Sequence, residues 1–103
     1  MSFTVLWTDE AYSTFEKRIE YLMMHWTDKE IRHFKNRVME YLDTLKEEPF
    51  IGKRAGKSRN VHIGLIIKQV SVIYRIKVKR KEIELISFID NRQDPRKIKK
   101  YTS

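Results

Sequence analysis

The sequence predicts one α+β domain in the order β-α-α-β-β-β, with an N-terminal helical hairpin packed on one face of a mostly antiparallel sheet. Three observations predict this architecture. The chain has 103 residues, which is enough for one compact core. Its apolar residues recur at helical spacing in the first half and alternate with a period of two in the second. We therefore expect a single domain that spans residues 1–103.

The first half begins with a strand and continues into two helices. Residues 3–7, FTVLW, are β-branched or aromatic and predict the strand. Thr8 is the expected N-cap of the first helix, because two acidic residues follow it in the first turn. Thr27 and Glu30 form the T-x-x-E pattern of a capping box at the start of the second helix, which Pro49 ends.

Each predicted helix carries one apolar stripe with spacings of three and four. The first stripe contains Ala11, Phe15, Ile19, Leu22 and Met23, and the second contains Ile31, Phe34, Val38, Leu42 and Leu45. Only a couple of residues separate the two stripes, so the helices are expected to form an antiparallel hairpin. The methionines at positions 23, 24 and 39 are expected to fill the core or its border.

The second half predicts three strands, over about 61–68, 70–78 and 83–89, with a turn at 79–82 between the last two. Gly64 in the first of them marks a bulge or a close approach. Strict alternation leaves one face of the sheet half polar and half apolar, with Ser71, Ile73, Arg75, Lys77, Glu84, Ile86 and Phe88. Such a face is either a partner groove or a surface covered by the chain's own tail.

The positive charge is concentrated in the middle of the chain. Residues 1–48 hold 7 Lys/Arg and 10 Asp/Glu, residues 49–81 hold 10 and none, and residues 82–103 hold 5 and 4. The net charges are −3, +10 and +1. An acid-free stretch of this length indicates a polyanionic or strongly acidic partner. The alternative is a solvated basic sheet edge, where lysines discourage aggregation.

Several classes of site and location are not expected. The chain has no cysteine, and His25, His33 and His62 lack metal-ligand spacing, so we expect neither a metal nor a cofactor. No apolar run approaches the roughly 20 residues that span a bilayer. The N-terminal MSFTVLWTDEAYS lacks the basic and apolar regions of a signal peptide. We therefore expect a cytoplasmic protein that does not associate with membranes.

Four short motifs, in their order and spacing, resemble the RelE/ParE superfamily of toxins. They are W-T-D-E-A at Trp7–Ala11, E-E-P-F-I-G at Glu47–Gly52, V-I-Y-R-I at Val72–Ile76 and I-D-N-R-Q-D-P at Ile89–Pro95. The resemblance implies the toxin half of a type II toxin–antitoxin pair, also described as a plasmid stabilisation protein. It further implies a small acidic antitoxin as partner, and as target either DNA gyrase (the ParE-like branch) or ribosome-bound messenger RNA (the RelE-like branch).

The resemblance also assigns candidate catalytic residues for the RelE-like branch. Arg92 matches the arginine that RelE-like enzymes direct at the phosphate, and Tyr101 matches the tail tyrosine that acts as acid or base, although their separation is longer than in that pattern. Ser71 stands where ribosome-dependent members carry an arginine, and Arg75, expected on the same face, is the candidate substitute. Arg92 is alternatively a structural residue, paired with Asp90 or Asp94.

The remaining candidate residues are predicted contacts for the target or the antitoxin. They are Lys53, Arg54, Lys57, Arg59, Lys77, Phe88 and Arg96. The alternative function is a basic RNA-binding module without enzymatic activity. In that module the aromatic residues would stack on bases, with Tyr74, Phe88 and Tyr101 as the candidates.

Overall fold

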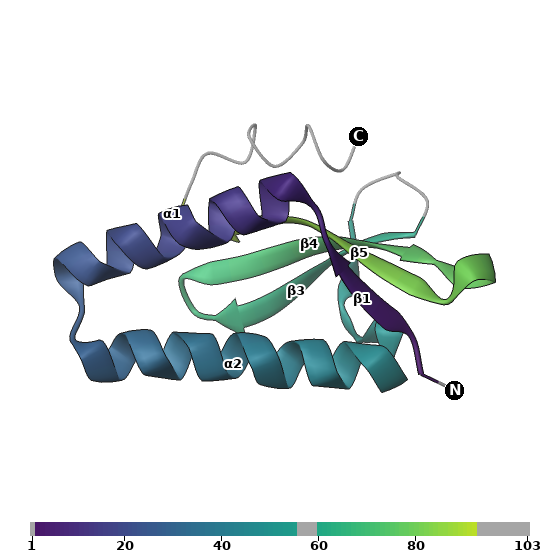
Figure 1. The fold of residues 1–103 in the computed structure, drawn as a ribbon, viewed down its shortest axis with the longest axis horizontal. Helices are drawn as coiled ribbons and strands as arrows, with labels where there is room; N and C mark the ends of the chain where they lie inside the picture. Colours follow the sequence, from purple (N-terminus) through teal and green to yellow (C-terminus); the bar gives the residue numbers. More distant parts are fainter. Residues whose placement is uncertain (1, 56–59, 93–103) are drawn as a thin grey trace.

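The structure is a computed structural model and describes residues 2–55 and 60–92 (Figure 1). Its elements are β1 (Thr4–Trp7), α1 (Asp9–His25), α2 (Asp28–Glu47), the 3₁₀ turn η1 (Pro49–Ile51), β2 (Lys53–Arg54), β3 (Val61–Ile67), β4 (Val70–Lys77), the 3₁₀ turn η2 (Val78–Arg80) and β5 (Glu82–Asp90). This order confirms the predicted β-α-α-β-β-β architecture. The short strand β2 is an addition that the sequence pattern did not predict.

The strands form one five-stranded sheet in the order β1-β5-β4-β3-β2. β1 pairs with β5 in parallel, and the other neighbouring pairs are antiparallel. The parallel pair arises because the helical hairpin carries the chain from β1 across one face of the sheet, and parallel strands require such a crossover. The prediction of a mostly antiparallel sheet is therefore confirmed, and the last strand lies between the first strand and β4.

Both helices begin where the sequence predicted. The Thr8 hydroxyl accepts a hydrogen bond from the Ala11 amide at 3.0 Å, and so caps the first turn of α1. At the start of α2, the Thr27 hydroxyl accepts from the Glu30 amide at 3.3 Å, while the Glu30 carboxylate accepts from the Thr27 amide at 3.2 Å. These bonds satisfy amide groups that a helix leaves without partners at its N-terminus.

The main core lies between the helical hairpin and the sheet. From the helices it takes mainly Leu22, Phe34, Val38 and Leu45, and from the sheet Val72, Tyr74, Ile76, Ile83, Leu85 and Phe88. The expectation that the methionines belong to this core is wrong, because Met23, Met24 and Met39 are all exposed. Successive residues of a helix are turned by about 100°, so Met23 leaves the inward face that Leu22 occupies.

A β-bulge in β5 changes which residues reach the core. Ile73 pairs with Ser87 whereas the next residue of β4, Tyr74, pairs with Leu85, so Ile86 is the extra residue. The side-chain alternation of β5 reverses at this point. Phe88 is 1% exposed and its ring packs on the rings of Trp7 and Phe15 on the helical side. The predicted position of Phe88 on the opposite face is therefore wrong.

The face of the sheet away from the helices carries a second, smaller apolar cluster. Its buried members are Ala55, Val61, Ile73 and Ile89, with Ile63 and Ile86 partly buried against them. The buried Ser71 and Ser87 add polar groups to this face. The predicted mixture of polar and apolar residues is therefore observed. The tail that was considered as its cover lies outside the described residues.

Two tyrosines join the end of α2 and the turn η1 to the sheet. The Tyr74 hydroxyl donates a hydrogen bond to the Pro49 carbonyl oxygen at 3.0 Å and accepts one from the Gly52 amide at 2.9 Å. Burial and the neighbouring Tyr41 hydroxyl raise the pKa of Tyr74, which therefore stays a donor. Tyr41 lies directly against Gly64, where any Cβ would overlap its ring. The predicted close approach at Gly64 is thus confirmed.

Replacing Tyr74 by phenylalanine should destabilise the fold. Tyr74→Phe leaves the Pro49 carbonyl and the Gly52 amide without their partner, and a buried polar group left unpaired costs about 1–3 kcal/mol. The exposed Tyr12 is the matched control, since Tyr12→Phe should change the free energy of unfolding by less than about 0.5 kcal/mol. Urea denaturation measures both variants. Equal stabilities for the two variants would contradict the role given to this hydroxyl.

Candidate functional site: a basic band and an arginine pair

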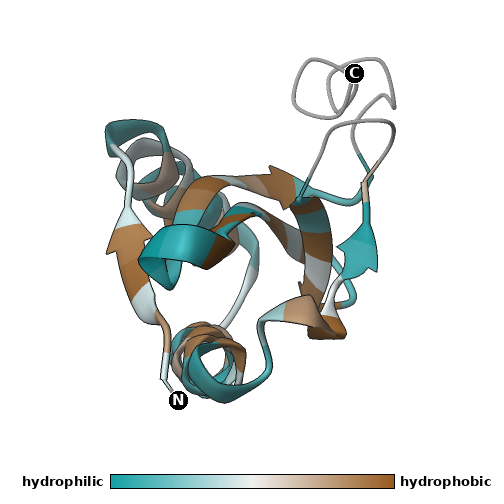
Figure 2. Ribbon diagram, turned by 90° about the vertical axis from the view of Figure 1, so that its right-hand side faces the viewer, coloured by the Kyte–Doolittle hydropathy of each residue, from teal (hydrophilic) through white to brown (hydrophobic). Residues whose placement is uncertain are grey.

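Basic side chains from three elements gather at one end of the sheet. We call them the basic band, and they are Lys53 and Arg54 of β2, Arg75 and Lys77 of β4, and Lys79 and Arg80 of η2. β2 and β4 are the two neighbours of β3, so about 10 Å separates them. The η2 turn faces the viewer in Figure 2 and is coloured hydrophilic in front of the apolar strands. Six of the ten cations of the acid-free stretch therefore lie toward one end of the sheet, whereas Lys68 lies in the β3–β4 turn at the other end.

Part of the basic band lines an open pocket of about 530 Å³. Its walls are Asn60, Arg75, Lys77, Lys79 and Arg80, together with the apolar Ile76 and Val78. Lys77 makes an ion pair with Glu84 at 3.3 Å. Among the described residues no carboxylate pairs with Arg75, Lys79 or Arg80. These unpaired cations give the pocket a positive potential that suits an anionic ligand or partner.

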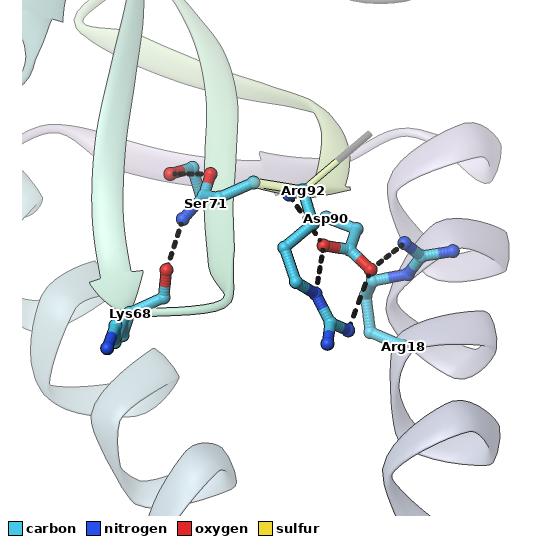
Figure 3. A network of polar contacts seen from close by, with 6 residues as sticks. Arg18, Lys68, Ser71, Asp90 and Arg92 are labelled. Atoms are coloured by element: carbon cyan, nitrogen blue, oxygen red, sulfur yellow. Dashed lines mark hydrogen bonds and ion pairs between the residues drawn. The ribbon is translucent and has the colours of Figure 1, made fainter. Parts of the chain in front are cut away.

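A second cluster of charged residues lies where β5 ends beside α1 (Figure 3). The Arg92 guanidinium donates from Nε to Asp90 Oδ1 and from Nη2 to Asp90 Oδ2, both at 3.1 Å, and the Arg92 amide donates to Oδ1 at 2.8 Å. The same guanidinium lies 5.1 Å from the centre of the Tyr21 ring on α1. Arg18 Nη1, also on α1, lies 4.0 Å from Asp90 Oδ2. Arg92 is therefore directed at α1.

The hydrogen bonds and charges around Asp90 affect its pKa more strongly than its burial does. Burial alone would raise the pKa of the Asp90 carboxyl, but the hydrogen bonds from Arg92 and the charges of Arg92 and Arg18 outweigh it and hold that pKa below its usual range. Conversely, the pKa of Arg92 is raised, mainly by its hydrogen bond to Asp90 and to a smaller extent by its interaction with Tyr21. Asp90 is thus an anion held between two arginines.

Ser71 has a structural partner at the end of the same strand pair. Its hydroxyl donates to Asn91 Oδ1 at 2.7 Å, and Asn91 Nδ2 in turn donates to the Lys68 carbonyl oxygen at 3.0 Å. The Asn91 amide also donates to the Gln69 carbonyl oxygen at 2.8 Å. This network fixes the turn that precedes Arg92. The position where ribosome-dependent toxins are expected to carry an arginine therefore holds a small residue that braces the turn.

The structure does not bring together Arg75 and Arg92, the two candidate catalytic residues in the described part of the chain. In the β4–β5 ladder Val70 pairs with Asp90 whereas Arg75 pairs with Glu84, so five residues, or about 17 Å, separate Arg75 from the strand end that carries Arg92. Arg75 is exposed at the basic band, and Arg92 is directed at α1. Tyr101, Lys57, Arg59 and Arg96 lie outside the described residues, so their roles stay predictions.

Sequence reasoning missed the part that α1 contributes to the second cluster. Arg18 and Tyr21 were not among the candidate residues, yet both contact the Asp90–Arg92 pair. One signal was present in the sequence. Arg18 lies three residues after Phe15 and four before Leu22, which places a charged side chain on the apolar stripe of the helix. A cation at such a position requires an anionic partner, and Asp90 is that partner.

No metal centre is found in the part of the chain that the structure describes, since no three acidic, histidine or cysteine side chains gather there. The described helices also include none long and apolar enough to cross a bilayer.

Comparison with known proteins identifies the fold. No protein-family model and no curated protein sequence matches this chain. Among solved structures, the chain has the fold of the RelE/ParE toxins. It matches a mutant of the E. coli toxin RelE in the free state with a TM-score of 0.68, over 99% of this chain and 95% of that one, at 10% identity.

Two complexes show the same fold. For the chromosomal ParDE toxin–antitoxin system from P. aeruginosa the TM-score is 0.65 at 17% identity, over 86% of this chain and 96% of that one. For the toxin–antitoxin complex RelBE2 from Mycobacterium tuberculosis the TM-score is 0.62 at 16% identity, over 88% of this chain and 100% of that one. The resemblance inferred from the four sequence motifs is thereby confirmed at the level of the fold.

The lowered pKa of Asp90 predicts a pH-dependent contribution to stability. Because the folded carboxylate binds a proton less readily than the unfolded one, its stabilising effect is complete above the ordinary aspartate pKa of about 3.9 and is lost as the pH falls through the lower folded value. Wild type should therefore exceed Asp90→Asn in free energy of unfolding at pH 7, and the difference should shrink by pH 3. Urea denaturation at both pH values measures it. A difference that stays constant would contradict this assignment.

Proposed function

We propose that this chain is the toxin of a type II toxin–antitoxin pair of the RelE/ParE superfamily, and that an acidic antitoxin silences it. The observation that carries the proposal is the fold, which the chain shares over most of its length with both RelE and ParE proteins. The concentrated charge of the basic band supports an acidic partner. Lys57, Arg59 and Arg96 remain predicted contacts of the same partner or of the target.

We favour inhibition of DNA gyrase, as in the ParE-like branch, over cleavage of messenger RNA. Metal-free cleavage needs a base, an acid and a cation that converge on one phosphate. Three features oppose such convergence: Arg92 is bound to Asp90 beside α1, Arg75 lies about 17 Å further along the sheet, and Ser71 braces a turn. Inhibition by binding requires only a complementary surface. A toxin with this target acts in the cytoplasm.

The alternative of a sequence-tolerant RNA-binding module receives less support. Such modules stack bases on exposed aromatic rings of a sheet or groove. Two of the three aromatic residues considered for this role, Tyr74 and Phe88, are buried in the main core. The third, Tyr101, lies outside the described residues. The basic band therefore offers charges for an anionic surface, but neither Tyr74 nor Phe88 can stack on a base.

Expression of this chain without an antitoxin should arrest bacterial growth. Purified protein should block supercoiling by DNA gyrase and should leave ribosome-bound messenger RNA intact, because the described arginines do not converge on one phosphate. Growth curves, a supercoiling assay and primer extension on ribosome-bound RNA provide the three measurements. Normal growth at high levels of folded protein would contradict the toxin assignment. Cleavage of the RNA would instead assign the chain to the RelE-like branch.

Charge reversal in the basic band should weaken the complex with the antitoxin. The variant Arg75→Glu/Lys79→Glu/Arg80→Glu replaces attraction by repulsion, and the salt dependence of the affinity should also fall, since exposed charges are screened by salt. A matched control, Lys17→Glu/Lys29→Glu/Arg32→Glu, reverses the same number of exposed charges on the helices. Calorimetry with an acidic protein encoded beside this chain measures both. Equal losses in the two variants would show that only net charge matters.

A further inference from the structure

Arg18 is a largely buried arginine whose hydrogen-bonding capacity is unfilled. Its side chain is 17% exposed, and its Nε is buried with no hydrogen-bond partner among the described residues. Within the described residues its one ionic contact is Asp90 Oδ2 at 4.0 Å, which is beyond hydrogen-bonding distance. Both oxygens of Asp90 already accept hydrogen bonds from Arg92. Two guanidinium groups therefore compete for one carboxylate, and Arg18 is the one that forms no hydrogen bond with a described residue.

This arrangement makes Arg92 the exchangeable member of the cluster. The Arg92 side chain is 55% exposed, whereas that of Asp90 is 15% exposed. Removing one partner of a buried ion pair is normally unfavourable, because it leaves an uncompensated charge behind. Here a shift of about 1 Å would bring Arg18 within the usual distance for a charged hydrogen bond to Asp90. Arg18 can therefore neutralise Asp90 when Arg92 leaves.

We propose that Arg92 is an exchangeable oxyanion-binding residue. It moves away from Asp90 and binds a carboxylate on an acidic peptide, and Arg18 then takes the place of Arg92 at Asp90. Arg18 is thus a positioning residue that acts through Asp90. The proposal rests on the proposed function only in taking the antitoxin as the source of the peptide.

The surroundings favour a peptide carboxylate over a nucleic acid. Arg92 already binds a carboxylate through two parallel hydrogen bonds, which is the geometry that a partner's Asp or Glu would reproduce. α1 carries four acidic residues, Asp9, Glu10, Glu16 and Glu20, against two basic ones, so it would repel any dense run of negative charge, and the site suits one carboxylate between neutral residues better than a chain of phosphates. Tyr21 is exposed beside Arg92, and the exposed Met24 follows one turn further along α1, so these side chains offer apolar contact to a peptide.

The test uses the blocked peptide acetyl-Leu-Glu-Leu-amide as a probe and its Gln analogue as a control. NMR titration of the full-length protein follows the Arg92 Nε–H signal, or the Tyr21 ring signals in the variant that lacks Arg92, and gives the dissociation constant. Asp90→Asn should bind the Glu peptide about tenfold more tightly, because hydrogen bonds to charged groups are worth roughly that factor. Arg92→Lys should bind it weakly, since lysine lacks the planar fork.

The distinctive result concerns Arg18. Arg18→Met should weaken binding of the Glu peptide by about tenfold, because Arg92 must then stay to neutralise Asp90. Arg18→Gln is a second, more polar variant with the same expected direction. In the double variant Asp90→Asn/Arg18→Met there is no carboxylate left to neutralise, so its affinity should equal that of Asp90→Asn. Arg37→Met, which removes an exposed ion pair with Glu40 on α2, should change nothing.

Three outcomes would overturn the proposal. An unchanged affinity in folded Arg18→Met and Arg18→Gln, whatever their melting temperatures, would make Arg18 a structural residue only. Equal binding of the Glu and Gln peptides would remove the carboxylate from the proposal. A single-stranded RNA that shifts the Arg92 signal, while the Glu peptide does not, would assign the site to nucleic acid. Growth arrest is not part of this measurement, so the proposed function and this inference fail independently.

Discussion

The bulge at Ile86 is the constraint on which the rest of the structure depends. With an uninterrupted ladder, β5 would direct Ser87 and Ile89 at the helices and Phe88 away from them. The extra residue reverses this alternation, so Phe88 enters the main core and Asp90 points toward α1. Aromatic packing with Trp7 and Phe15 stabilises the bulged arrangement. One inserted residue therefore decides both the composition of the core and the direction of the strand end.

The position of Arg92 follows from this reversal. Since Asp90 points toward α1, its carboxylate meets Arg18 and draws the guanidinium of Arg92 over Tyr21. The hydrogen bonds of the Asn91 side chain with Ser71 and with the Lys68 carbonyl oxygen hold the chain at the end of β5, so the backbone that carries Arg92 has little freedom to take another direction. Arg92, the candidate catalytic residue of that motif, is thereby turned away from the second face of the sheet. This is the physical basis for favouring inhibition by binding over catalysis.

Much of the fold is predictable from local chemistry, whereas the site depends on pairings between distant segments. Single residues with a local effect predicted the caps at Thr8 and Thr27 and the close approach at Gly64. The alternation of side chains along one strand predicted β4. The bulge leaves no such signal, because Ser87 and Ile89 also satisfy a simple alternation. The two-residue strand β2 is too short to show a period, and the contact of Arg18 with Asp90 joins residues far apart in the sequence.

The two charged features make different demands on a partner. The basic band includes Arg75, about 17 Å along the sheet from the strand end that carries Arg92, and extends to the η2 turn where β5 begins, about 30 Å from that strand end. A rigid globular partner would have to present acidic groups at both features on one fixed surface. An extended peptide of about ten residues spans the same distance, and an acidic segment without fixed structure could place carboxylates at both ends of it. Partly disordered partners bind large surfaces in this way, and the separation of the two features therefore favours a partner that binds as an extended chain.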